Sequence, residues 1–355
     1  MKGRIDSLQI IRAFAAILVV ICHIWNDGWL SPAVVELGSF GVDLFFVLSG
    51  FIMCLTVKLS GRSKEANAGH FLLKRIVRIF PIYVICAVPL LVFNIKAEGL
   101  KDAFFYIGNI FLLPSFTENL DYRLVLGPGW TLVYEMLFYY IFAMFMLLSD
   151  RKKILLPLIA VCLTFIVFIF RIFDLQGPQR GWVNASYILG DTLLINFVLG
   201  IVCFFIYEAL RDKIKLHVSS SLLVLLVMCT LAAYLYTVCG LPRLFAYGLP
   251  AFVSVSLFTL TQMGAIENKS MKILIFTGDA SYSIYLTHYY FAFFKPKLVN
   301  KSSFFNVDFS IFLNLLDISL VVGAVVGGCL FYRWIEKPII TYSSKGFSLK
   351  TKKIG

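Results

Sequence analysis

The sequence predicts an all-α fold, a polytopic membrane bundle of about ten transmembrane helices. Three observations lead to this prediction. The 355 residues are 60% hydrophobic and 15% charged, with a mean hydropathy of +0.86, whereas soluble proteins are about 25% charged. Apolar runs of membrane-spanning length recur along the whole chain. The Lys and Arg residues lie in short clusters between these runs, as in the loops of membrane proteins.

Ten apolar runs are long enough to be expected crossings. They lie at 9–25, 38–57, 79–95, 130–148, 154–173, 188–208, 219–239, 244–262, 273–294 and 308–332. With the amino terminus in the cytoplasm, most Lys and Arg residues fall on the cytoplasmic side, as the positive-inside rule requires. We therefore expect both termini in the cytoplasm. One transmembrane domain would occupy residues 1–340, followed by a basic cytoplasmic tail over 341–355.

The connection at 96–129 is too long for a simple turn. It contains FFYIGNIFLLP, which is apolar but too short to cross, so we expect an interfacial or re-entrant segment. The formal net charge of +12 does not indicate nucleic-acid binding, because the basic residues are distributed as topology signals. The eight cysteines show no C-x-x-C spacing, and we expect them to be unpaired.

The first run, QIIRAFAAILVVICHIW, contains Arg12 and His23, and both are costly in hydrocarbon. They are eleven positions apart, which places them on one helix face, about 16 Å from each other along the axis. This face therefore offers a cation near one membrane surface and an imidazole near the other. The structural alternative is that Arg12 snorkels to the headgroups while His23 caps a neighbouring carbonyl.

The polar residues within the spans fall into two sets by expected depth. The cytoplasmic set is Arg12, Arg75 and Arg78, and the extracytoplasmic set is His23, Asp43, Trp130, Glu135 and His288. A carboxylate in a membrane needs a partner, and we expect an imidazole or a bound ligand.

A polar stripe marks the expected ninth span. Its members share a narrow helical arc and are Thr277, Ser281, Tyr285 and His288. This pattern fits either a cavity wall or hydrogen bonding between helices. The two histidines and two carboxylates of the outer set could also hold a metal, but no H-E-x-x-H or paired-His spacing occurs, so no metal is expected.

The two sets together fit base-assisted acyl transfer. A neutral imidazole in a dry site can act as a general base for a hydroxyl, and an adjacent carboxylate fixes its tautomer. Guanidinium groups bind phosphate oxygens in pairs. A donor with phosphates at one end and an acyl group on a long arm would match both sets.

Six ordered motifs resemble the acyltransferase 3 family of integral membrane acyltransferases, and the likeness covers nearly the whole chain. They are the Arg12 and His23 pair with ten residues between, GVDLFFVLSGF at 41–51, R-x-x-R at Arg75 and Arg78, GWTLVYEMLFYY at 129–140, DASYSIYLTH at 279–288 and RWIEKP at 333–338. The opening SLQIIRA departs from the L-D-G-L-R of many members. With the WTLxYE form, it looks most similar to the exopolysaccharide O-acetylating branch.

The resemblance implies a role for each motif residue. His23 would be the catalytic base, with Asp43, Glu135 and His288 also in the catalytic site; Arg12, Arg75 and Arg78 would contact donor phosphates, and Trp130 and Tyr285 would bind substrate. Such proteins move acetyl or related groups from cytoplasmic acyl-CoA to glycan hydroxyls outside the cytoplasm.

We therefore expect a multi-pass O-acyltransferase, in the first place an O-acetyltransferase, of the bacterial inner membrane. Its donor would be acetyl-CoA or another acyl-CoA, and its acceptor a surface polysaccharide or its lipid-linked precursor. The alternatives are a glycolipid or polysaccharide transporter or flippase, and a structural subunit of a polysaccharide assembly complex. Transporters tend to show paired interrupted helices, which are not apparent in this sequence. No sequence feature indicates an oligomeric state.

Overall fold

A computed structural model describes residues 5–25, 28–57, 59, 63–116, 122–263, 268–300 and 309–343. The regular secondary structure of these residues is helical, apart from two isolated bridges that join Ser115 to Asn184 and Leu216 to Thr261. The predicted all-α fold is confirmed. The predicted basic tail, from residue 344 onwards, lies outside the described residues.

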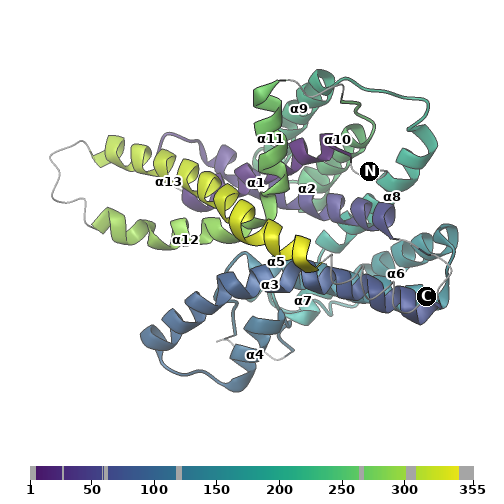
Figure 1. Ribbon diagram of the computed structural model, residues 1–355, viewed down its shortest axis with the longest axis horizontal. Helices are drawn as coiled ribbons and strands as arrows, with labels where there is room; N and C mark the ends of the chain where they lie inside the picture. Colours follow the sequence, from purple (N-terminus) through teal and green to yellow (C-terminus); the bar gives the residue numbers. More distant parts are fainter. Residues whose placement is uncertain are drawn as a thin grey trace.

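The helices form one bundle (Figure 1). In chain order they are α1 (Ser7–Ile24), α2 (Pro32–Thr56), α3 (Lys64–Glu98), α4 (Ala103–Phe111), α5 (Gly129–Leu148), α6 (Lys152–Ile172), α7 (Ala185–Gly190), α8 (Leu193–Leu210), α9 (Val218–Thr237), η1 (Leu244–Gly248), α10 (Leu249–Thr259), α11 (Lys269–Asp279), α12 (Ser281–Asn300), α13 (Phe309–Phe331) and η3 (Tyr332–Glu336). The elements η1 and η3 are π-helical segments that adjoin α10 and α13.

Within the described ranges, eight helices are long and apolar enough to cross a membrane. They are α1, α2, α3, α5, α6, α8, α9 and the stretch Phe309–Ser343. Two of the ten expected crossings do not correspond to a single helix of membrane-spanning length. The eighth corresponds to the shorter apolar helix Leu244–Thr259, and the ninth is interrupted at Ala280, between α11 and α12. The expected count of ten crossings is therefore not confirmed.

Helix α1 is the central element of the bundle, because it packs against α2, α10, α11, α12 and α13. Small residues allow these close approaches. Ala13, Ala15 and Ala16 are fully buried, and a Cβ added at Gly278 of α11 would collide with the backbone of Gln9 in α1. Close backbone packing through small residues is how helices associate without a hydrophobic driving force between them.

The pair α2 and α8 shows the same principle. A Cβ added at Gly50 would meet the carbonyl oxygen of Phe197, and one added at Gly200 would meet the carbonyl oxygen of Val47. The two helices therefore touch backbone to backbone. This contact fixes α2, which carries several of the motif residues.

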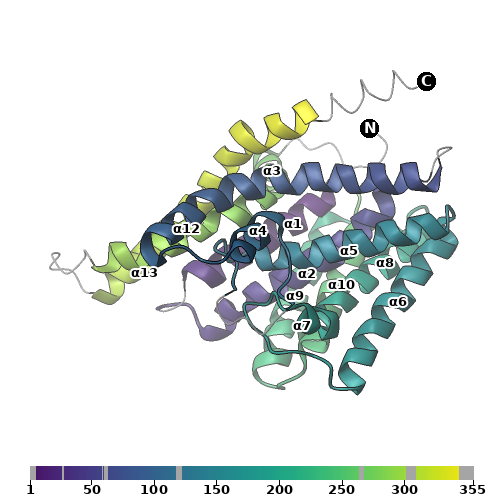
Figure 2. The ribbon, with the colours of Figure 1, turned by 90° about the horizontal axis from the view of Figure 1, so that it is seen from below.

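Helix α3 is longer than the expected crossing at 79–95, since it begins at Lys64 and runs for 35 residues. The Ser63 side chain caps its start by accepting a hydrogen bond from Ala66 N at 3.3 Å, and Gly99, with φ of +82°, follows its last residue. Figure 2 shows α3 running along the bundle beside α5. Arg75 and Arg78 thus lie within a helix rather than before one.

The long connection at 96–129 contains the nine-residue helix α4, which is too short to cross a membrane, as predicted. Asp102 caps this helix by accepting a hydrogen bond from Phe105 N at 2.7 Å. All eight cysteines are unpaired, as expected.

Candidate active site

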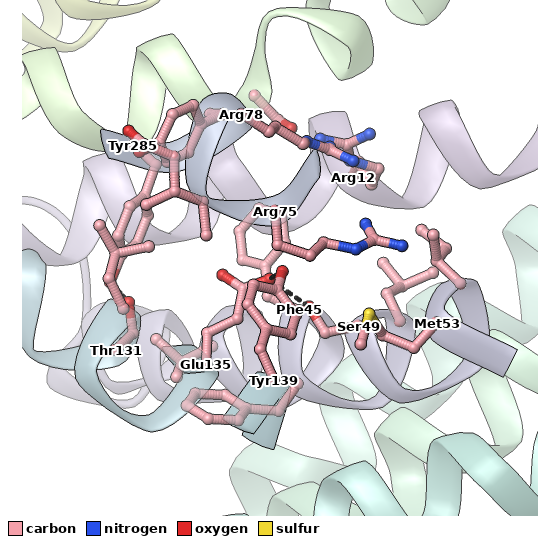
Figure 3. Close-up of a pocket in the computed structure, with 18 residues that line it drawn as sticks. Arg12, Phe45, Ser49, Met53, Arg75, Arg78, Thr131, Glu135, Tyr139 and Tyr285 are labelled. Carbon is pink, nitrogen blue, oxygen red and sulfur yellow. Dashed lines mark hydrogen bonds between the residues drawn. The ribbon is translucent and has the colours of Figure 1, made fainter. Parts of the chain in front are cut away.

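A cavity of about 110 Å³ lies between α1, α2, α3, α5 and α12. Five predicted site residues line it, namely Arg12, Arg75, Arg78, Glu135 and Tyr285. Figure 3 shows the three guanidinium groups entering this space from α1 and α3, with Glu135 and Tyr139 of α5 across from Arg75. We call it the arginine cavity. It gathers motif residues that lie far apart in the chain.

Two of the three arginines have uncharged hydrogen-bond partners. Arg12 Nη1 donates to Gln9 Oε1 at 3.3 Å, and Arg75 Nη2 donates to Thr56 Oγ1 at 2.7 Å. Among the described residues, no ion pair includes any of the three. Their positive charge therefore remains available for an anion that enters the cavity.

Glu135 lies beside the arginines in this cavity. Its expected depth in the membrane had assigned it to the extracytoplasmic set instead. Its Oε1 accepts hydrogen bonds from Ser49 Oγ at 3.2 Å and from the hydroxyl of Tyr139. The reason is its position in α5. It lies six positions after the helix start at Gly129, which places it about 9 Å further along the axis.

Ser281 gives the cavity a second kind of polar group. It is fully buried at the start of α12, it lines the cavity, and its hydroxyl has no hydrogen-bond partner. The break at Ala280 separates it from Thr277, which lies in α11 and bonds to its own helix at Ile273 O. The expected four-residue stripe is therefore divided between two helices. A buried hydroxyl without a partner is costly unless a ligand engages it.

His23 and His288 form a pair beside Tyr285. Their ring centroids are 5.0 Å apart and the rings meet edge to face at 61°. In each residue Nδ1 faces the carbonyl oxygen four residues earlier, Val19 O at 2.9 Å and Ile284 O at 3.3 Å. Because a carbonyl only accepts, Nδ1 must carry the proton and Nε2 the lone pair.

The two imidazoles differ in exposure. His23 is exposed, whereas His288 is fully buried and its Nε2 has no hydrogen-bond partner. No carboxylate contact to either ring appears among the hydrogen bonds and ion pairs of the described residues. The tautomers are therefore fixed by backbone carbonyls instead of by the carboxylate that we expected.

Tyr285 is shared by the arginine cavity and the histidine pair. Its ring lines the cavity and lies 5.9 Å from the ring of His288, centroid to centroid. Its hydroxyl donates to Pro128 O at 3.1 Å and lies 2.8 Å from Thr131 Oγ1. One aromatic side chain thus adjoins both groups of predicted site residues.

Asp43 is fully buried, and its charged partner is a guanidinium group rather than an imidazole. Arg243 donates to Asp43 Oδ2 from Nε at 3.0 Å and from Nη2 at 2.8 Å, and Asn196 Nδ2 donates to Oδ1 at 2.6 Å. Asp43 does not line the arginine cavity. Arg243, which directly precedes η1, was missed because no sequence spacing links it to Asp43.

Trp130 belongs to the neighbourhood of Arg243. Its ring stacks on Trp182 at 4.9 Å, and the guanidinium of Arg243 lies 5.8 Å from the ring centroid of Trp182. Trp182 has a positive φ of +61°, which is uncommon for a side chain of this size. Trp182 was also missed, since it stands alone in a polar connection.

The four possible metal ligands lie in three different places. The histidines face each other, Asp43 binds Arg243 and Glu135 lies in the arginine cavity. Within the part of the chain that the structure describes, no three His, Cys, Asp or Glu side chains are grouped so that they could hold a metal ion.

Comparisons with known proteins were made for the whole chain. O-acetyltransferase OatA of Staphylococcus aureus (strain NCTC 8325 / PS 47) is 27% identical over 384 residues, which cover 99% of this chain and 60% of OatA. Putative peptidoglycan O-acetyltransferase YrhL of Bacillus subtilis (strain 168) is 24% identical, with 97% of this chain and 56% of YrhL covered. Putative acetyltransferase ORF330 of Acidianus two-tailed virus is 26% identical over 78% of this chain and 80% of its own.

The chain thus spans about 60% of the length of OatA. No solved structure matches it. None of the three names mentions an exopolysaccharide, and one names peptidoglycan, so these relatives do not support the narrower resemblance to the exopolysaccharide branch. Residues 5–334 match the family profile described as Acyltransferase domain. Because this match covers nearly all of the chain, the protein belongs to that acyltransferase family, the one that its six motifs resemble.

Proposed function

We propose that this protein is a multi-pass membrane O-acetyltransferase that moves an acetyl group from acetyl-CoA to a glycan hydroxyl. One observation carries the proposal: an arginine-lined cavity and a histidine pair with free Nε2 atoms both adjoin Tyr285. The first fits the donor's phosphates, and the second fits the base that the acceptor requires.

The donor end of the proposal rests on charge and size. Three guanidinium groups without ion-pair partners in the described chain attract phosphates, and the unpartnered hydroxyl of Ser281 offers a further hydrogen bond. The cavity of about 110 Å³ is smaller than a typical pocket for a whole ligand. We therefore expect only the pantetheine arm and the adjoining phosphates to enter, with the nucleotide outside.

The chemical step follows from the tautomer of His23. The acceptor hydroxyl gives its proton to His23 Nε2 while its oxygen attacks the thioester carbonyl carbon. The C–O bond forms, the C–S bond breaks, and the thiolate of CoA leaves and takes up a proton from the imidazolium. Val19 O holds Nδ1–H throughout. His288 offers a second free Nε2 that can share this proton.

The direction of α1 determines from which side of the membrane the donor and the acceptor approach. Arg12 and His23 lie about 16 Å apart on one face of this helix. We propose that the Arg12 end faces the cytoplasm, where acyl-CoA is, in agreement with the positive-inside rule. The exposed His23 then meets the acceptor on the outer side of the bacterial inner membrane.

The acceptor class is a cell-envelope glycan, either peptidoglycan, which the name of one relative mentions, or a surface polysaccharide and its lipid-linked precursor. The test uses purified protein in vesicles with acetyl-CoA labelled on the acetyl group and soluble fragments of each glycan. We expect label on one glycan and an equal amount of released CoA thiol. Release of thiol without any labelled glycan would contradict the proposal.

A further inference from the structure

The end of α1 that carries His23 is held by two other helices. Ile24 is the last residue of α1, and its carbonyl oxygen is one of the four that a helix leaves without an internal partner. Lys295 of α12 donates from Nζ to Ile24 O at 2.7 Å. The same Nζ lies 2.7 Å from Asp317 Oδ1 of α13. A cation at a helix C-terminus also complements the helix dipole.

This ion pair is unusually well buried. The Asp317 side chain is 1% exposed and that of Lys295 is 16% exposed. Among the ion pairs of the described ranges, only Asp43 with Arg243 is comparably buried, whereas Lys101 and Glu98, for example, are 28% and 39% exposed. Buried charges are costly, and their retention calls for a reason beyond stability.

A second contact holds the residues just after His23. Asn314 lies one turn before Asp317 in α13 and is fully buried. Its Oδ1 accepts hydrogen bonds from Trp25 Nε1 at 3.2 Å and from Trp29 N at 2.8 Å. Helix α13 therefore holds the residues that follow α1 through Asn314, and it holds Lys295, which caps the end of α1, through Asp317.

Lys295 and His288 connect α12 to the same end of α1. They are seven residues apart on α12, about two turns, so they lie on nearly one face. His288 meets His23, and Lys295 meets the next residue, Ile24. The position of α1 relative to α12, and with it the separation of the two imidazoles, is thus fixed at two adjacent points.

We propose that Lys295, held by Asp317, is a positioning residue that sets His23 against His288 for acyl transfer. The inference rests on the proposed function. It assigns a catalytic purpose to a buried ion pair outside the six motifs. Because a displacement of about 1 Å in a reacting group can cost up to about a hundredfold in rate, a small shift of the α1 end would lower kcat without affecting donor binding in the arginine cavity.

The test removes both charges together, since a single loss would leave the other buried and unpaired. For Lys295→Met/Asp317→Leu we expect normal accumulation in the membrane, an unchanged KM for acetyl-CoA and a kcat at least about tenfold lower. Lys295→Arg, which keeps the cation, should retain most of the kcat. The matched control, Arg211→Gln/Glu208→Gln, removes an exposed ion pair and should leave both constants unchanged.

A folded double variant with the kcat of the wild type would overturn the inference, since the pair would then be structural only. If the double variant does not accumulate, Asp317→Asn, which keeps the bond from Lys295 to Ile24 O, is compared with Lys295→Gln. A wild-type kcat in Lys295→Gln would also overturn it. A wild-type protein that transfers no acetyl group would instead overturn the proposed function, and this inference with it.

Discussion

The imidazoles of His23 and His288 lie edge to face with ring centroids 5.0 Å apart, one at the end of α1 and the other within α12. Each Nδ1 is engaged by a backbone carbonyl, so both Nε2 atoms are free for proton transfer. His23 is exposed and His288 is buried. A substrate hydroxyl can therefore approach the first, while the second stays shielded from solvent.

His23→Ala should lower acetyl transfer by about 10²–10⁴-fold, the usual contribution of a general base. The protein should still accumulate in the membrane, because the side chain is exposed. The measurement is the rate of label transfer to glycan in vesicles. His217→Ala, which replaces an exposed histidine outside the arginine cavity and the histidine pair, is the control and should transfer at the wild-type rate. Full activity of the His23 variant would remove this residue from the mechanism.

Arg75→Ala and Arg78→Ala should each raise the KM for acetyl-CoA by about 10–100-fold, since a hydrogen bond to a charged group is worth about 1.5–3 kcal/mol. The choice of acceptor should not change. Steady-state kinetics over a range of acetyl-CoA concentrations measures the effect. Arg211→Ala, at an exposed site, is the control. A KM that stays the same in both cavity variants would contradict donor binding in the arginine cavity.

Ser281→Ala should weaken donor binding without lowering the thermal stability of the protein. The hydroxyl has no partner in the protein, so its removal should leave thermal stability equal or slightly higher. Donor affinity should fall about fivefold if the hydroxyl meets a phosphate or the pantetheine arm. The control is Ser254→Ala, where a buried hydroxyl donates to Pro250 O, outside the cavity. A lower stability with normal donor affinity would assign Ser281 to packing instead.

Asp43→Asn should destabilise the protein by about 3–5 kcal/mol, because it leaves Arg243 buried without a counter-charge. Asp43→Asn/Arg243→Gln, a neutral pair that can still hydrogen-bond, should recover most of this loss. Thermal unfolding in detergent follows both variants. We also expect the double variant to transfer acetyl groups. A stable double variant without transfer would return Asp43 to the catalytic site.

Local patterns were enough to predict part of this site. The face of α1 with Arg12 and His23 follows from helix geometry alone, since an apolar run of 18 residues has no other means of satisfying its backbone in a membrane. The motifs around Arg75 and Glu135 identified residues that line one cavity. The structure adds that Glu135 lies beside the arginines. This could not be predicted, because it depends on the residue at which α5 begins.

Long-range contacts account for what could not be predicted. The pairing of Asp43 with Arg243 joins positions that share no periodicity. The break at Ala280 falls inside the expected crossing at 273–294, close to the point where Gly278 packs against the backbone of Gln9. Lys295 and Asp317 lie on separate helices, and nothing in either local sequence indicates that they meet at the end of α1.

The central claim is that a donor bound at the Arg12 end of α1 is used at the His23 end. The most direct measurement places the purified protein in sealed vesicles of known orientation, with labelled acetyl-CoA on one side only and the glycan on the other. We predict labelled glycan only when acetyl-CoA is on the side of the Arg12 end, and none with His23→Ala. Equal transfer from either side, or transfer that persists without His23, would contradict the account.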